Sequence, residues 1–163
     1  MLSKTSLLAT RALLVLANDQ QGVATSPRQI AGLLGESHAY MAKVLRLLVK
    51  AGILHAERGA KGGVFLNRQP SEISLLNIVE ACQGQIAGSY CQDVADRRTT
   101  CSFHRAALEL QTSIVQVLAH WSLEDLAEIP VARHALPGGI QCVMTGALGA
   151  IPGPVQLGPS ESK

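Results

Sequence analysis

Aromatic residues and long apolar runs are both scarce in this sequence. Phe, Tyr and Trp make up 3% of the chain, whereas hydrophobic residues as a whole make up 47%. The core must therefore be built from Leu, Val, Ile and Ala, a composition that favours packed helices over a β-sandwich. No stretch approaches the roughly 20 apolar residues of a membrane span, and Arg11 interrupts the apolar residues near the N-terminus before they reach the length of a signal-peptide core. We therefore expect a mainly α, cytoplasmic protein without a membrane partner.

The patterns of common enzyme sites are also missing from the sequence. It contains no Ser-His-Asp arrangement, no phosphate-binding loop and no dinucleotide-binding fingerprint. It has only four cysteines, and in a cytoplasmic protein these are more often free thiols or metal ligands than structural disulfides. The sequence therefore indicates a binding protein and not an enzyme.

Charge is divided unevenly along the chain. Residues 1–68 hold nine Lys and Arg against three Asp and Glu, whereas residues 69–163 hold five against nine. The formal net charge of +2 therefore conceals a basic front portion and an acidic remainder. A basic portion of this kind is typical of a surface that binds nucleic acid.

The clearest structural pattern lies within the basic portion. Ser26 is a good N-cap for a short helix, and Gln29 is placed to complete a capping box. Gly35 follows at a position where a left-handed residue commonly ends a helix. A second helix is predicted over residues 38–51, because its apolar residues recur at i, i+3, i+4 and i+7. These apolar residues are Met41, Val44, Leu45 and Leu48. An apolar helix over residues 2–17 is expected to pack behind this pair.

A basic β-hairpin is predicted after the second helix, with strands over residues 53–57 and 63–67. A helix-turn-helix followed by such a hairpin is a winged helix-turn-helix, so we predict a DNA-binding domain over residues 1–69. Contacts with double-stranded DNA are expected from the start of each helix, from the charged face of the second helix and from the hairpin loop. The predicted contact residues are Arg28, Ser37, His38, Tyr40, Lys43, Arg46, Arg58, Lys61 and Gly62.

A sensor and dimerisation region is predicted over residues 70–130. It comprises a short helix over residues 73–82, a polar loop over residues 85–100, a long helix and a last short helix that begins at Ser122. Residues 131–163 are rich in Gly and Pro and are predicted to form a flexible tail.

The long helix is predicted from Cys101 to Trp121, with Thr99 or Thr100 beginning it. Its apolar residues follow heptad spacing and form a seam that packs on its own domain or on a second copy. The seam residues are Ala107, Leu110, Ile114, Val117 and Trp121. We favour a homodimer, because a palindromic operator calls for two recognition helices.

The chain resembles the Rrf2-type winged-helix regulators, a family that includes iron–sulfur regulators and nitric-oxide sensors. The resemblance covers about residues 1–130, and the wing over residues 58–64 is its most specific part. Further similar segments are residues 26–31, 40–45, 48–54, 78–81 and 121–126. The resemblance implies a dimeric transcription factor whose long helix is the dimer seam. It also implies, as in many relatives, an iron–sulfur cluster, often two-iron two-sulfur, held by three cysteines before that helix.

The candidate cluster ligands are Cys82, Cys91, Cys101 and His104. Cys101 and His104 share one face of the first helical turn, where the helix dipole favours a thiolate. The middle cysteine that relatives carry between Cys91 and Cys101 is absent, and Cys82 occurs earlier in the chain. Three interpretations follow: an iron–sulfur cluster, a cluster-free thiol sensor, or inert buried thiols.

The leading interpretation is thus a homodimeric DNA-binding regulator that senses through cysteines beside its dimerisation helix. One alternative is a cluster-free regulator controlled by a partner protein or a small molecule. Another is a winged-helix module that binds a protein, because a charged helix face is also typical of an ordinary solvated surface.

Overall fold

The computed structural model describes residues 2–18, 24–59, 62–86 and 101–128. Its elements, in order, are α1 (Lys4–Asn18), α2 (Pro27–Leu34), α3 (His38–Lys50), β1 (Leu54–Glu57), β2 (Gly63–Leu66), η1 (Pro70–Glu72), α4 (Leu75–Gln83), α5 (Ser102–His120) and α6 (Leu123–Ala127). The mainly helical fold predicted from the sequence is confirmed, and the predicted elements are present with ends that differ by at most two residues. The predicted tail and most of the predicted polar loop lie outside the described residues.

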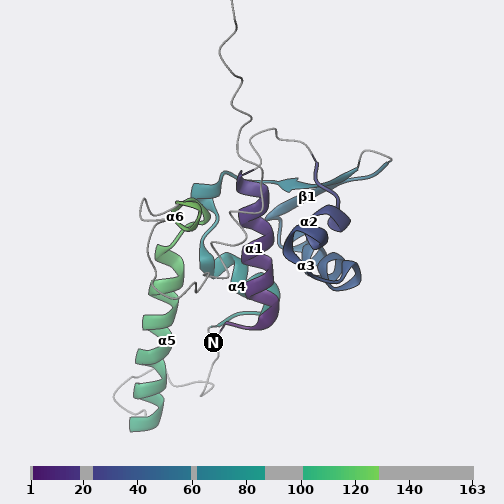
Figure 1. The fold of residues 1–163 in the computed structure, drawn as a ribbon. Helices are drawn as coiled ribbons and strands as arrows, with labels where there is room; N and C mark the ends of the chain where they lie inside the picture. The colour runs from purple at the N-terminus through teal and green to yellow at the C-terminus, as the bar shows by residue number, and fades with distance from the viewer. Residues whose placement is uncertain (1, 19–23, 60–61, 87–100, 129–163) are drawn as a thin grey trace, which may run out of the picture.

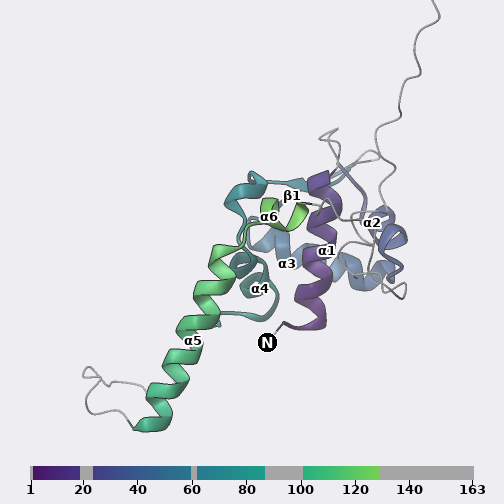
Figure 2. The same cartoon turned by 60° about the vertical axis from the view of Figure 1, so that its left-hand side comes forward.

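Helix α1 lies at the centre of the described structure, as Figure 1 and Figure 2 show from two sides. Helices α2 and α3 pack on one side of α1, and helices α4 and α6 both pack on the other side of α1. Burial of α1 on both sides explains why apolar residues occupy most of its length. Its buried apolar residues are Leu8, Ala9, Ala12, Leu13, Leu14, Val15 and Leu16. Within the described residues, no helix combines the length and apolarity needed to traverse a lipid bilayer.

The helix-turn-helix is set by local interactions that the sequence predicts. The Ser26 hydroxyl accepts a hydrogen bond from the Gln29 backbone N–H at 3.2 Å, and the Gln29 side-chain oxygen accepts one from the Ser26 N–H at 2.9 Å. Gly35 ends α2 with a φ of 66°, a left-handed conformation that costs glycine little. Ser37 then caps α3 by accepting from the Tyr40 N–H. The turn between the helices is therefore short and fixed at both ends.

The wing is a two-stranded antiparallel hairpin that is fastened to the segment before α2. Strands β1 and β2 pair from Leu54 opposite Leu66 to Glu57 opposite Gly63. Thr25 and Val64 exchange two backbone hydrogen bonds of 3.0 Å each. These bonds tie the wing to the N-cap end of α2, so the hairpin and the helix pair form one unit.

Helix α5 is joined to this body at its C-terminal end and projects from it (Figure 2). The Leu75 N–H donates to the Trp121 carbonyl at 2.8 Å, and the Leu123 N–H donates to the Ile73 carbonyl at 2.7 Å. None of the 19 residues of α5 is buried. The helix begins at Ser102, and its N-cap is the Cys101 side chain instead of the predicted Thr99 or Thr100.

Candidate nucleic-acid interface

Helix α3 has one buried face and one charged, exposed face. Its buried residues are Met41, Val44, Leu45 and Leu48, at the spacing predicted from the sequence. His38, Lys43 and Arg46 are exposed on the other side. Arg46 folds back so that its Nε donates to the Ala42 carbonyl of its own helix at 3.3 Å. Burial of the apolar face therefore sets the orientation of the helix and leaves Lys43 and Arg46 on the solvent-exposed side.

The C-terminal end of α3 is held by two residues from the end of the wing, Asn67 and Arg68. The Asn67 side-chain amide donates to the Gly52 carbonyl at 3.1 Å, and Arg68 Nη2 lies 3.5 Å from the Ala51 carbonyl oxygen. A cation is favoured here because carbonyl groups at the end of a helix carry partial negative charge. Neither role is predicted by the sequence pattern, because each depends on a contact between residues at least 15 positions apart.

The N-terminal end of α3 is joined to α1 through Tyr40. The Tyr40 side chain is half-buried, and its hydroxyl lies 3.1 Å from the Thr5 hydroxyl. The Lys4 ammonium lies 5.9 Å from the centroid of the Tyr40 ring. The side chain that sequence analysis places against base edges is thus packed, and a cation from α1 lies beside it.

A groove of about 390 Å³ separates α3 from the wing. Pro27 of α2, Arg46 of α3 and Gly62 of the hairpin loop all line it. Three segments that the sequence assigns to DNA binding therefore meet around one hollow. Arg28 and Arg58 are exposed, whereas Lys61 lies outside the described residues.

Gly62 is required by the tight geometry of the wing. Its N–H donates to the Gly59 carbonyl at 3.0 Å. A Cβ at this position would meet the Glu57 carbonyl oxygen and would lie 2.9 Å from the Arg58 carbonyl carbon. The structure therefore gives Gly62 a steric role in the turn.

Two of the predicted cluster ligands lie at the start of α5, Cys101 as its N-cap and His104 in its first turn. The exposed Cys101 sulfur accepts a hydrogen bond from the His104 backbone N–H at 3.4 Å. His104 Nδ1 is buried and has no hydrogen-bond partner among the described residues. Cys91 lies outside the described residues. Among the residues that are described, no three His, Cys, Asp or Glu side chains are grouped to hold a metal ion.

Cys82 lies in a different environment, at the end of α4. It is half-buried and packs against the hydrophobic core. Burial raises the pKa of the Cys82 thiol to about 11, because the thiolate would lose its hydration. A thiolate at this position is therefore disfavoured unless a metal stabilises it.

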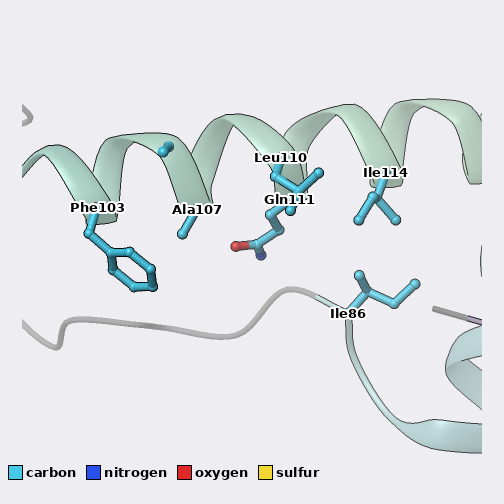
Figure 3. Close-up of a pocket in the computed structure, with 7 residues that line it drawn as sticks. Ile86, Phe103, Ala107, Leu110, Gln111 and Ile114 are labelled. Carbon is cyan, nitrogen blue, oxygen red and sulfur yellow. The ribbon is translucent and has the colours of Figure 1, made fainter.

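A second hollow, of about 330 Å³, runs along the apolar side of α5. Phe103, Leu110 and Ile114 line it from the helix, and Ile86 faces them from the segment after α4 (Figure 3). The side-chain oxygen of Gln111 is buried there and has no hydrogen-bond partner within the described part of the chain. This side of α5 thus combines exposed apolar surface with one unsatisfied acceptor.

Comparison with known proteins identifies the family of the chain. A family described as "Rrf2: Iron-dependent Transcriptional regulator" matches residues 2–129. The chain belongs to the Rrf2 family. Members of the Rrf2 family are DNA-binding transcriptional regulators and not enzymes, so the regulator class predicted from the sequence is confirmed.

Individual relatives of this Rrf2 regulator are similar over most of their length. Protein aau3 of Rhizobium meliloti is 28% identical over 131 residues, which cover 78% of this chain and 84% of the relative. The structure of CymR (YrzC), the global cysteine regulator of B. subtilis, has a TM-score of 0.65 at 24% identity, covering 78% of this chain and 95% of CymR. T. potens IscR has a TM-score of 0.64 at 24% identity, covering 84% and 93%. These structures confirm the winged-helix fold.

Proposed function

We propose that this Rrf2 protein is a homodimeric transcriptional regulator that binds a palindromic DNA operator and senses through cysteines near α5. Residues 1–69 form the DNA-binding domain in this proposal, residues 70–130 form the sensor and dimerisation region, and residues 131–163 form a tail. The observation that carries it is the complete lack of buried residues in α5, beside a well-packed winged domain.

The exposed seam of α5 supports a dimer through residues Cys101 to Trp121. Phe103, Leu110 and Val117 are 74%, 63% and 59% exposed. Apolar side chains aligned on one helix face usually mark an interface when they are left in water. A second copy would cover the seam and place two recognition helices on one operator.

In the proposed complex the exposed face of α3 enters the major groove, where His38, Lys43 and Arg46 meet base edges and phosphates. Arg28 and Ser37, at the starts of the two helices, contact the backbone. Arg58, Lys61 and Gly62 of the wing contact the minor groove or phosphates. Support comes from the exposure of His38, Lys43, Arg46, Arg28 and Arg58 beside the α3–wing groove.

The DNA-binding proposal is tested by titrating operator DNA, taken from the sequence upstream of the gene, at several salt concentrations. Each phosphate contact contributes about 0.9 to the slope of log affinity against log salt. We expect Lys43→Gln to lower the slope by about one unit. Arg105→Gln, which removes an exposed cation of α5, is the matched control and is expected to leave the slope unchanged. A wild-type affinity that does not depend on salt contradicts the proposal.

The dimer is tested by placing a carboxylate in the seam. Leu110→Asp is expected to weaken the dimer by roughly 30-fold or more, because a central seam residue contributes about 2 kcal/mol or more. Thr112→Asp puts the same charge on the opposite side of α5 and is the control. Sedimentation analysis of both variants gives the dissociation constants. If Leu110→Asp remains as dimeric as Thr112→Asp, the seam is not the interface.

The sensor proposal rests on the donor atoms near the start of α5. Cys101 offers an exposed sulfur and His104 a buried nitrogen without a partner, and thiolate with imidazole suits an iron–sulfur cluster. Cys91 is the proposed third ligand. Cys82 fits less well, because burial raises its pKa to about 11. Bound here, a two-iron two-sulfur cluster would supply redox or nitric-oxide chemistry, while Cys101 and His104 would hold it beside α5.

The visible absorption spectrum of anaerobically purified protein tests the cluster. We expect sulfur-to-iron absorption in the wild type and its loss in Cys101→Ala. If the wild type has no visible absorption after reconstitution with iron and sulfide, the cluster proposal is wrong.

A second candidate is cluster-free control by a small molecule. It is favoured by the hollow beside α5, in which Phe103 and Leu110 provide apolar surface (Figure 3). The Gln111 oxygen in this hollow receives no hydrogen bond from the residues that the structure describes. A colourless protein whose DNA affinity still changes with an apolar ligand that carries a hydrogen-bond donor would support this candidate over the cluster.

A further inference from the structure

We infer that Lys4 of α1 contacts a DNA phosphate and that Tyr40 is the positioning residue that directs it there. The inference rests on the proposed DNA-binding function and extends the interface to a helix outside the helix-turn-helix and the wing. It also assigns Tyr40 a role different from the base contact that the sequence predicts.

Contacts between residues far apart in the sequence carry this inference. The Tyr40 and Thr5 hydroxyls lie 3.1 Å apart although the residues are separated by 35 positions. The Lys4 ammonium lies 5.9 Å from the centroid of the Tyr40 ring. Tyr40 is half-buried, whereas Lys4 is exposed. The tyrosine is therefore fixed between two helices and presents its ring to a cation that remains open to a partner.

The location of the pair within the fold points to phosphate. Tyr40 belongs to the first turn of α3, the part of a recognition helix that enters the major groove. That groove is about 12 Å wide, so the phosphates at its edge lie only about half that distance from a helix along its centre. The Lys4 ammonium lies 5.9 Å from the centroid of the Tyr40 ring, so it flanks the turn that would enter the groove, where phosphates line the edges. Lys4 is thus suited to contact the backbone and not the bases.

The aromatic ring prepares the lysine for this contact. A free lysine side chain loses considerable rotamer freedom when it binds. Attraction between the ammonium and the face of the Tyr40 ring restricts that freedom in advance. The Thr5 hydroxyl in turn fixes the ring through its hydrogen bond. Tyr40 therefore affects DNA binding through Lys4, and its removal should matter only while Lys4 is present.

The test is a double-mutant cycle on operator binding, measured across salt concentrations with the full-length protein. We expect Lys4→Gln to lower the salt slope by about one unit and to weaken all operator sequences equally. Lys4→Arg is expected to restore the slope. Tyr40→Leu should weaken binding in the wild type, and it should have little further effect in Lys4→Gln. Arg105→Gln controls for the loss of one positive charge.

Further variants keep the test informative if Tyr40→Leu folds poorly. Tyr40→Phe keeps the ring and removes only the hydrogen bond, and Thr5→Val removes the same bond from the α1 side. Both should weaken binding by the same small factor. Thermal unfolding of each variant separates a loss of fold from a loss of contact.

Several results would overturn the inference. An unchanged slope in Lys4→Gln means that Lys4 touches no phosphate. Tyr40→Leu with an equal effect in both backgrounds, or with altered preference among operator base variants, means that Tyr40 reads a base itself. A wild-type protein that binds no operator refutes the proposed function, whereas wild-type binding with these variant results refutes the role of Lys4 and Tyr40 alone.

Discussion

The winged domain and helix α5 differ in the burial of their apolar residues. In the body, α1 and α3 place their apolar residues in a shared core, where Leu13 and Leu48 are fully buried. In α5, residues of the same chemical kind remain exposed, with Leu110 at 63%. Apolar residues recur at helical spacing in both regions. This spacing alone therefore does not show whether the apolar face of a helix is buried within its own chain or remains exposed. The contrast supports the proposal that a second copy of the chain covers the apolar face of α5.

The largest effect that would sharpen this contrast is expected from truncating leucines in the two regions. Leu13→Ala should lower the free energy of unfolding by about 2–5 kcal/mol, because it leaves a cavity in the core. The loss should be the same at low and at high protein concentration. Leu110→Ala should instead have an effect that depends on protein concentration, because dimer formation contributes to stability. Urea unfolding of both variants at two concentrations makes the comparison, and a concentration-independent loss in Leu110→Ala would break it.

A smaller effect is expected where the wing meets the segment before α2. A Cβ on Gly63 would lie 2.7 Å from the Thr25 carbonyl carbon and oxygen. Gly63→Ala should therefore lower the free energy of unfolding by about 1–3 kcal/mol, as overpacking does. Gly32, in α2, has no atom within 4 Å of its Cβ position, so Gly32→Ala is the matched control and should be neutral or slightly stabilising. If Gly63→Ala and Gly32→Ala change the thermal unfolding equally, the Thr25 backbone moves away from the added methyl group without loss of stability.

Helix caps provide a third comparison between the regions. Ser26→Ala should cost about 1 kcal/mol, because the Gln29 N–H loses its acceptor. Cys101→Ser should preserve α5, because a hydroxyl can accept the His104 N–H in place of the sulfur. Circular dichroism and chemical denaturation measure both. A large loss of helix in Cys101→Ser would mean that the sulfur does more than cap.

A further expected effect concerns the pH dependence of stability. Burial raises the pKa of Cys82 from 9.0 to about 11 in the folded chain. The folded state therefore retains this proton over a range in which the unfolded chain releases it. The contribution to stability is fully present below pH 9 and is lost as the pH rises toward 11. The difference in stability between the wild type and Cys82→Ala, measured by denaturation at several pH values, should shrink over this range. A constant difference would mean that the Cys82 thiol ionises as easily folded as unfolded.

Sequence reasoning was most successful where a structural feature depends on neighbouring residues. The Ser26–Gln29 capping box and the left-handed Gly35 were both predicted and are confirmed. The paired strands of the wing were also predicted and are confirmed. Each of these features is set within a few residues by side-chain hydrogen bonds or backbone conformation. The family resemblance, which relied on the same segments, is likewise confirmed.

Prediction was less successful for features that depend on distant contacts or uncommon acceptors. The Tyr40–Thr5 contact and the attachment of Arg68 to the end of α3 leave no periodic signal in the sequence. Threonine was predicted to begin α5 because hydroxyl groups are common caps, but the Cys101 sulfur takes that role. The assignments of residues to DNA contact and to cluster binding remain predictions, and two of these residues, Cys91 and Lys61, lie outside the described residues.

The backbone pairing of residues 73–75 with residues 121–123 attaches α5 at its C-terminal end, so a small rotation there moves its N-terminal end by a large distance. Hydrogen bonds of 2.7 Å and 2.8 Å hold the C-terminal end of α5 to the segment before α4. Cys101 lies at the other end of this 19-residue helix. At 1.5 Å per residue the helix is about 28 Å long, so a tilt of about 10° at the held end moves the far end by about 5 Å. In the proposed regulator, a displacement of a few ångströms at Cys101 would therefore correspond to a rotation of about 10° where α5 meets the rest of the chain.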